Sequence, residues 1–201
     1  MANDTTKKLL WGALALALVA GGIGLMVWVN QTATELKAAR PSEPPAFLAG
    51  TPPAYLHEYV QGDFSGDRLE AANKARYKEM VAWPTEPNWE LAAVIRGFRM
   101  QSGPTTRTEA SIEVTYDTLG ELNLHDFTYK PAPQREILPF VLVPGKERYT
   151  IVSPMLKPHV GVEAAIAFLE RMEVNSAPYR ANIRQSIDRI RADAQATEKR
   201  P

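Results

Sequence analysis

The sequence offers three imidazoles as candidate metal ligands or general bases: His57, His125 and His159. They stand in three separate segments, and none has a second ligand at the i, i+4 spacing of a helical metal site. The chain contains no cysteine, which excludes disulfides, thiolate metal sites and a cysteine nucleophile. We therefore expect surface or hydrogen-bonded core histidines, with no bound metal and no cofactor.

His125 and Asp126 are adjacent in the sequence, and Asp117 precedes them. Adjacent residues of a strand point to opposite faces of a sheet. His125 and Asp126 would therefore enter one cavity only where the chain bends. Four early aromatic residues would line a pocket or, more often at such spacing, form core: Tyr55, Tyr59, Tyr77 and Trp83.

Known ligand-binding motifs give little support for an enzyme. Residues 63–67 (Asp-Phe-Ser-Gly-Asp) resemble half of a calcium loop, but position 12 would be Lys74 in place of a bidentate glutamate. A turn with a helix cap is the better interpretation. The chain has no Walker A sequence, nucleophile elbow or dinucleotide glycine pattern outside residues 9–29. We predict a protein that is not an enzyme, with no catalytic residues.

The first structural element that the sequence predicts is a membrane anchor. Residues 9–29 carry no charge, and 17 of the 21 are apolar. A helix of this length covers roughly 31 Å, the thickness of the hydrocarbon core of a bilayer. A cleaved signal peptide is the alternative, but its apolar region would be shorter and followed by small residues. The span's predicted membrane contacts include Leu9, Trp11, Ala13, Ala17, Gly21, Gly24, Trp28 and Val29.

Charges beside the span predict its orientation. Lys7 and Lys8 favour a cytoplasmic N-terminus for residues 1–8, and a C-terminal body that is periplasmic or extracellular. We therefore expect a single-pass protein of the cell inner membrane. Small residues at i, i+4 and i+8 (Ala13, Ala17, Gly21) would form a packing face for another helix, although alanine and glycine are common in such spans.

A proline-rich linker over residues 30–53 separates the span from the body, with five prolines between residues 41 and 53. The body is expected to begin with two helices, at 54–62 and from 65–67 to 81. Alternation over 108–116 predicts a half-buried strand, and 89–100, 136–143 and 148–153 predict three more. The expected fold class is α+β: an N-terminal transmembrane helix, two helices on a curved four-stranded antiparallel sheet, and two C-terminal helices.

The last predicted helix, within residues 176–201, is amphipathic and basic. Ile183, Ile187, Ile190 and Ala194 form an apolar stripe, and arginines occupy the other faces. Three partners are open for this stripe: its own domain, a second protein, or anionic lipid. We predict Ile183, Ile187, Ile190 and Ala194 as partner-binding residues.

The order of the body's elements resembles the NTF2-like (cystatin-like) α+β cone over residues 54–175. The residues that carry the resemblance are Val114-x-Tyr116, Leu119-Gly120-Glu121-Leu122, Phe140-x-Leu142-Val143 and Glu147-Arg148-Tyr149-x-Ile151. An anchor, linker and such a domain are similar to the layout of the VirB8-like assembly factors of bacterial secretion machines. The two helices after the sheet depart from the simplest pattern of the superfamily. Enzymes of that superfamily commonly hold an acid or a His–Asp pair inside the cone, and the resemblance would assign that role to His125, Asp126 or Asp117.

Charge and layout together favour a scaffold. The 23 basic and 23 acidic residues balance, which argues against a nucleic-acid partner. Residues 41–176 are acidic, whereas 177–201 are basic. We predict a membrane-anchored non-catalytic scaffold or accessory subunit that binds other membrane proteins of a complex, or its own copies. The alternatives are a small-ligand-binding NTF2-like domain and an enzyme of that fold.

Overall fold

The computed structural model describes residues 49–70, 73–146 and 148–198. The predicted transmembrane segment 9–29 and the linker up to residue 48 lie outside this range. In the part of the chain that is described, no helix is both long and apolar enough to cross a membrane.

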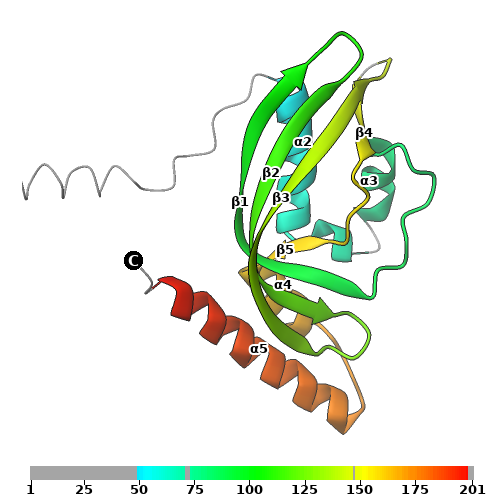
Figure 1. Cartoon of the computed structure of the whole chain (residues 1–201). Helices are drawn as coiled ribbons and strands as arrows, with labels where there is room; N and C mark the ends of the chain where they lie inside the picture. The colour runs from blue at the N-terminus through cyan, green and yellow to red at the C-terminus, as the bar shows by residue number, and fades with distance from the viewer. Residues whose placement is uncertain (1–48, 71–72, 147, 199–201) are drawn as a thin grey trace, which may run out of the picture. The chain divides into compact units, whose positions relative to one another are not determined.

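The body is built on one five-stranded sheet that curls into a half-barrel (Figure 1). The strands are β1 (Leu91–Thr105), β2 (Ala110–Asn123), β3 (Tyr129–Pro144), β4 (Tyr149–Ser153) and β5 (His159–Gly161). Their order across the sheet is β4-β3-β2-β1-β5. The β1–β2, β2–β3 and β3–β4 pairs are antiparallel, and β5 runs parallel to β1.

The expected four-stranded, wholly antiparallel sheet is therefore wrong: the sheet has a fifth strand, and the parallel pairing of that strand makes the sheet mixed. The strand that we missed, β5, has only three residues and pairs Ala93 with His159 and Ile95 with Gly161. A three-residue segment is too short to show the alternation by which strands are predicted. It is a strand because β1 offers it a free edge, which is a tertiary contact.

The central strands are long and bend within their length. Register shifts interrupt the β1–β2 pairing on both sides of Ile95, and the β2–β3 pairing between Thr118 and Gly120. Shifts of this kind insert extra residues and increase the local bend. A Cβ at Gly120 would lie 2.4 Å from the Lys130 carbonyl oxygen, so this bend needs glycine for the close approach of β3.

Helices cover the inner face of the sheet. They are α2 (Pro52–Phe64), the 3₁₀ turn η1 (Asp67–Leu69) and α3 (Lys74–Met80). The helix expected from residues 65–67 to 81 is thus a 3₁₀ turn followed by a shorter α-helix, with extended backbone at Glu70. The first core joins them to the sheet and includes Leu56, Tyr59, Val60, Tyr77, Met80, Ile112, Val114, Tyr116, Phe140, Leu142 and Ile151.

A second core lies on the opposite face of the lower part of the sheet, under α4 (Val162–Glu170) and α5 (Ala177–Glu198). Four consecutive residues of β1, Ala92 to Ile95, are buried because Ala93 and Ile95 belong to the first core, and Ala92 and Val94 to the second. A strand covered on both faces loses the alternation of a half-exposed one.

The stripe of α5 that we predicted as a partner surface packs into the second core. Ile183 and Ile187 are 8% and 9% exposed, and Ile190 is fully buried. Ala194 is half-buried. Of the three partners that the sequence left open, this structure places the chain's own domain against the isoleucines, so the stripe is not a free surface.

Candidate functional site

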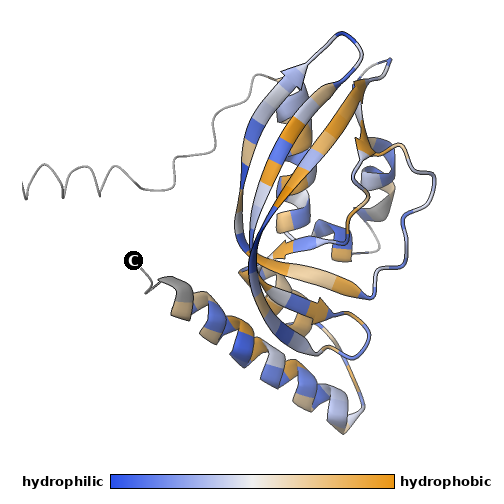
Figure 2. Ribbon diagram, viewed as in Figure 1, coloured by the Kyte–Doolittle hydropathy of each residue, from blue (hydrophilic) through white to orange (hydrophobic). Residues whose placement is uncertain are grey.

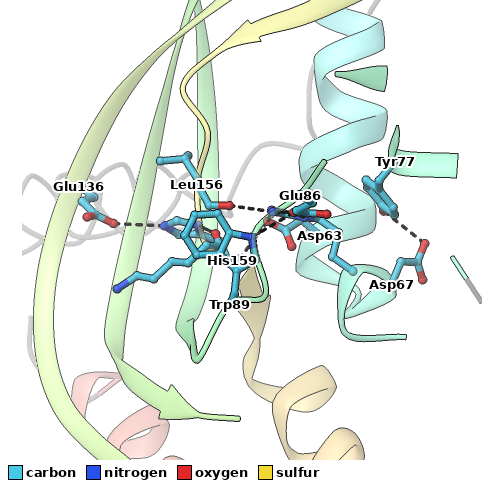
Figure 3. Close-up of polar contacts among 10 residues, drawn as sticks. Asp63, Asp67, Tyr77, Glu86, Trp89, Glu136, Leu156 and His159 are labelled. Carbon is cyan, nitrogen blue, oxygen red and sulfur yellow. Dashed lines mark hydrogen bonds and ion pairs between the residues drawn. The ribbon is translucent and has the colours of Figure 1, made fainter. Parts of the chain in front are cut away.

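The main concentration of buried charge lies where α2, η1 and β5 meet the inner face of the sheet (Figure 3). The Arg68 guanidinium donates from Nη1 to Asp63 Oδ2 at 2.9 Å, and from Nε to Glu86 Oε1 at 3.0 Å. Its Nη2 donates to the Leu156 carbonyl oxygen at 2.7 Å and also pairs with Glu86. Three segments far apart in sequence are thus held by one side chain.

A tight turn brings these residues together. Gly66 adopts a left-handed φ of 85° between α2 and η1, a conformation that glycine reaches without steric cost. The chain therefore reverses direction directly after Ser65, and Arg68 lies beside Asp63 of the preceding helix. Residues 63–67, the half calcium loop of the sequence, form this turn.

The local environment shifts the ionisation of the Asp63–Arg68 pair. Burial raises the pKa of the Asp63 carboxyl, and the charge of Arg68 opposes that shift. Burial disfavours the charge on Arg68, but Asp63, Tyr59 and Glu86 together more than compensate and raise the pKa of the guanidinium. The Tyr59 ring lies 5.4 Å from the guanidinium carbon and adds a cation–π contact. Asp63 Oδ1 remains buried without a hydrogen-bond partner among the described residues.

His159 extends this polar cluster to the sheet. Its backbone N–H donates to Asp63 Oδ2 at 2.9 Å. The ring stacks on Tyr116 with centroids 4.3 Å apart. Nδ1 lies 2.9 Å from the Lys157 carbonyl oxygen, and Nε2 lies 3.2 Å from Glu136 Oε2. Both ring nitrogens therefore face oxygen atoms of the protein. The hydrogen bond from His159 lowers the pKa of Glu136.

A histidine beside a carboxylate is a common general-base arrangement, but here the ring is closed off. The His159 side chain is 3% exposed, and Asp63 is 2% exposed. Tyr116, itself 1% exposed, covers one face of the imidazole. A substrate does not reach this ring without displacing core residues, so the cluster in this conformation acts as a set of cross-links between elements.

The structure separates the histidines that the sequence proposed. His57 lies on α2 against the Phe98 ring, His125 is exposed after the end of β2, and His159 is buried in β5. Among residues 49–70, 73–146 and 148–198, no group of three metal-ligating side chains comes together.

The two acids proposed for a cavity point elsewhere. Asp117 pairs with Arg135 at 3.1 Å on the exposed side of the sheet. Asp126 Oδ1 accepts hydrogen bonds from the Thr128 backbone and hydroxyl at 3.0 and 2.6 Å, which lower the pKa of Asp126. It stabilises the turn between β2 and β3. Tyr59, Tyr77 and Trp83 belong to the first core, and Tyr55 packs against it.

Comparisons of the chain with protein-family models, with curated proteins and with solved structures found no match. The resemblance to the NTF2-like domains and to the VirB8-like assembly factors thus stays a prediction from the sequence.

A pocket of about 460 Å³ opens beside the buried cluster. It is lined by η1, residues 88–90, the end of β2 with its following turn, and Phe168 of α4. Trp89 stands in its wall, and its indole N–H donates to Glu86 at 3.2 Å (Figure 3). The Arg68–Glu86 pair therefore orients a wall of the pocket.

Sequence reasoning missed Arg68 and Glu86. Arg68 belongs to a segment expected as an ordinary surface helix, and Glu86 to a proline-rich connection. The two residues are 18 positions apart and their pairing depends on the turn at Gly66, so no local sequence pattern predicts it. The nearest signal was Gly66 itself, which marks a turn but not the residues that the turn joins.

Proposed function

We propose that this protein is a membrane-anchored, non-catalytic scaffold or accessory subunit of a membrane protein complex, acting through its α+β body. The observation that carries the proposal is the closure of the polar cluster on the inner face of the sheet. Asp63, Arg68 and His159 are satisfied mainly by one another and by Glu86 and Glu136; these three residues are at most 5% exposed, whereas Glu86 and Glu136 are partly exposed. The apolar segment 9–29 supports the anchor.

The outer face of β3 and β4 is the surface that best fits such a role. Phe140, Leu142 and Ile151 point into the first core, so the residues that alternate with them point outward. Ile137 is 58% exposed and Val152 is 37% exposed, and the apolar character of this part of β3 is visible in Figure 2. We name this surface the outer β3–β4 face; it comprises Ile137, Pro139, Val141, Val143 and Val152.

Purification of the full-length chain in mild detergent tests the proposal. We expect other membrane proteins, or further copies of the chain, to co-purify, and Ile137→Glu to reduce their recovery. Met155→Glu is the matched control, because Met155 is 44% exposed but belongs to the loop after β4. A chain that runs alone as a monomer, with both variants identical to it, contradicts the scaffold.

Protease treatment of intact spheroplasts tests the orientation separately. We expect the body to be cleaved from outside, since the charge bias places residues 1–8 in the cytoplasm. Protection of the body would overturn this topology without affecting the scaffold proposal.

A further inference from the structure

The pocket beside Trp89 has the composition of a site for an organic cation. Its volume of about 460 Å³ lies within the range of small-molecule sites. Two aromatic side chains line it, Trp89 and Phe168. Aromatic faces attract ammonium and guanidinium groups, and tryptophan does so most strongly.

The charge balance of the pocket favours the same ligand. Glu90 lines it, is exposed, and makes no ion pair with any residue in the described part of the chain. Arg68 also lines it, but its side chain is 2% exposed and is shared between Asp63 and Glu86. These two carboxylates do not line the pocket, but they offset the charge of Arg68 from behind, so Glu90 supplies the negative charge of the lining.

The orientation of α4 adds to this field. Phe168 belongs to the last turn of α4, where the backbone dipole carries partial negative charge and favours cations. Arg171 at this helix end is already paired with Glu70 at 2.9 Å. The Asn123 and Asn88 side chains on the rim provide amide groups that can fix the orientation of a ligand.

We propose that this pocket binds a small organic cation of the guanidinium or alkylammonium class. The charged head would lie between Glu90 and the indole of Trp89, and Phe168 would contact its apolar stem. Asp63, Arg68 and Glu86 act indirectly, because Glu86 orients the indole. This site is independent of the scaffold role and of the outer β3–β4 face.

Binding of capped arginine amide, with capped citrulline amide as its uncharged isostere, tests the proposal. The full-length chain is labelled with 5-fluorotryptophan in detergent. The ¹⁹F resonance of Trp89 is assigned with Trp89→Phe. We expect capped arginine to shift this resonance in a saturable manner and capped citrulline to leave it unchanged.

Glu90→Gln separates specific recognition from general attraction. We expect it to weaken binding of capped arginine about fivefold, the effect of about 1 kcal/mol. Glu109→Gln removes the same charge from the β1–β2 turn and should leave binding unchanged. Equal binding of citrulline, equal affinity of Glu90→Gln, or the absence of a saturable shift of Trp89 would each overturn the proposal.

Discussion

The Arg68 guanidinium and the Asp63 carboxylate form an ion pair at 2.9 Å, with side chains only 2% and 3% exposed. The two residues are five positions apart, on either side of the turn at Gly66. Because Arg68 also bonds Glu86 and the Leu156 carbonyl, the pair fixes α2, η1 and two connecting segments to one another.

Removal of Arg68 should be severe. Arg68→Met leaves Asp63 and Glu86 without their cation in a buried setting, and breaking a buried pair in this way costs about 3–5 kcal/mol. Urea unfolding of the detergent-solubilised chain, followed by circular dichroism, measures the loss. Arg135→Met is the control, because the Arg135–Asp117 pair is exposed and should contribute less than about 1 kcal/mol. A loss below 1 kcal/mol for Arg68→Met would show that the cluster does not hold the elements together.

The Glu136–His159 contact predicts a dependence on pH. The hydrogen bond from His159 lowers the pKa of Glu136 below its ordinary value of 4.5. A carboxyl with a lowered pKa in the folded state contributes stability above its unfolded pKa, and this contribution is lost as the pH falls through the folded value. The difference in unfolding free energy between the natural chain and Glu136→Gln should therefore be steady above pH 4.5 and shrink below it.

The contribution of Asp63 to stability changes with pH in the opposite direction to that of Glu136. For this reason the test uses the difference in unfolding free energy between the natural chain and Glu136→Gln. The raised pKa of Asp63 favours the protonated form in the folded state, so its contribution is present below 3.8 and is lost as the pH rises through the folded value. Asp63 is common to both proteins and cancels to first order. A difference that stays constant through acid pH would show that Glu136 is not stabilised by His159.

Docking of α5 on the sheet should depend in part on the Ser186 hydroxyl. Ser186 Oγ accepts from the Tyr129 N–H at 2.8 Å and donates to the Phe127 carbonyl oxygen at 2.8 Å. Ser186→Ala leaves a buried backbone N–H unpaired, which costs about 1–3 kcal/mol. Gln185→Ala, at the adjacent exposed position, should change the unfolding free energy by less than about 0.5 kcal/mol. Equal stability of the two variants would contradict the role of this hydrogen bond.

We expect Ile187→Glu to lower the folding stability of the body, and not only its association with partners. The sequence by itself makes this change a test of partner binding, since the stripe would be a contact surface. In the structure Ile187 is 9% exposed within the second core, so the substitution buries an unpaired charge. We expect lower urea resistance and exposure of α5 to proteolysis. If Ile187→Glu left the stability unchanged but abolished association, the isoleucine stripe would be a partner-binding surface, as the sequence predicted.

Several local features follow from the sequence because their causes are local. Alternation of Ile112, Val114 and Tyr116 with polar residues indicated a strand with one buried face, and these three residues are buried in β2. Gly66 marked a turn because glycine, which has no Cβ, adopts a positive φ without steric cost. The periodicity of Ile183, Ile187 and Ile190 indicated one apolar helix face, but not what would cover it.

The tertiary structure alone decided which distant segments meet. β5 exists because β1 has a free edge beside it, and the Arg68–Glu86 pair exists because the turn at Gly66 returns the chain toward residue 86. The apolar face of α5 is compatible with a core, a partner or a lipid, and only the shape of the neighbouring sheet selects among them. The periodicity of apolar residues predicts which face of a helix or strand is buried. Contacts between residues far apart in sequence depend on the turns and bends that bring those faces together.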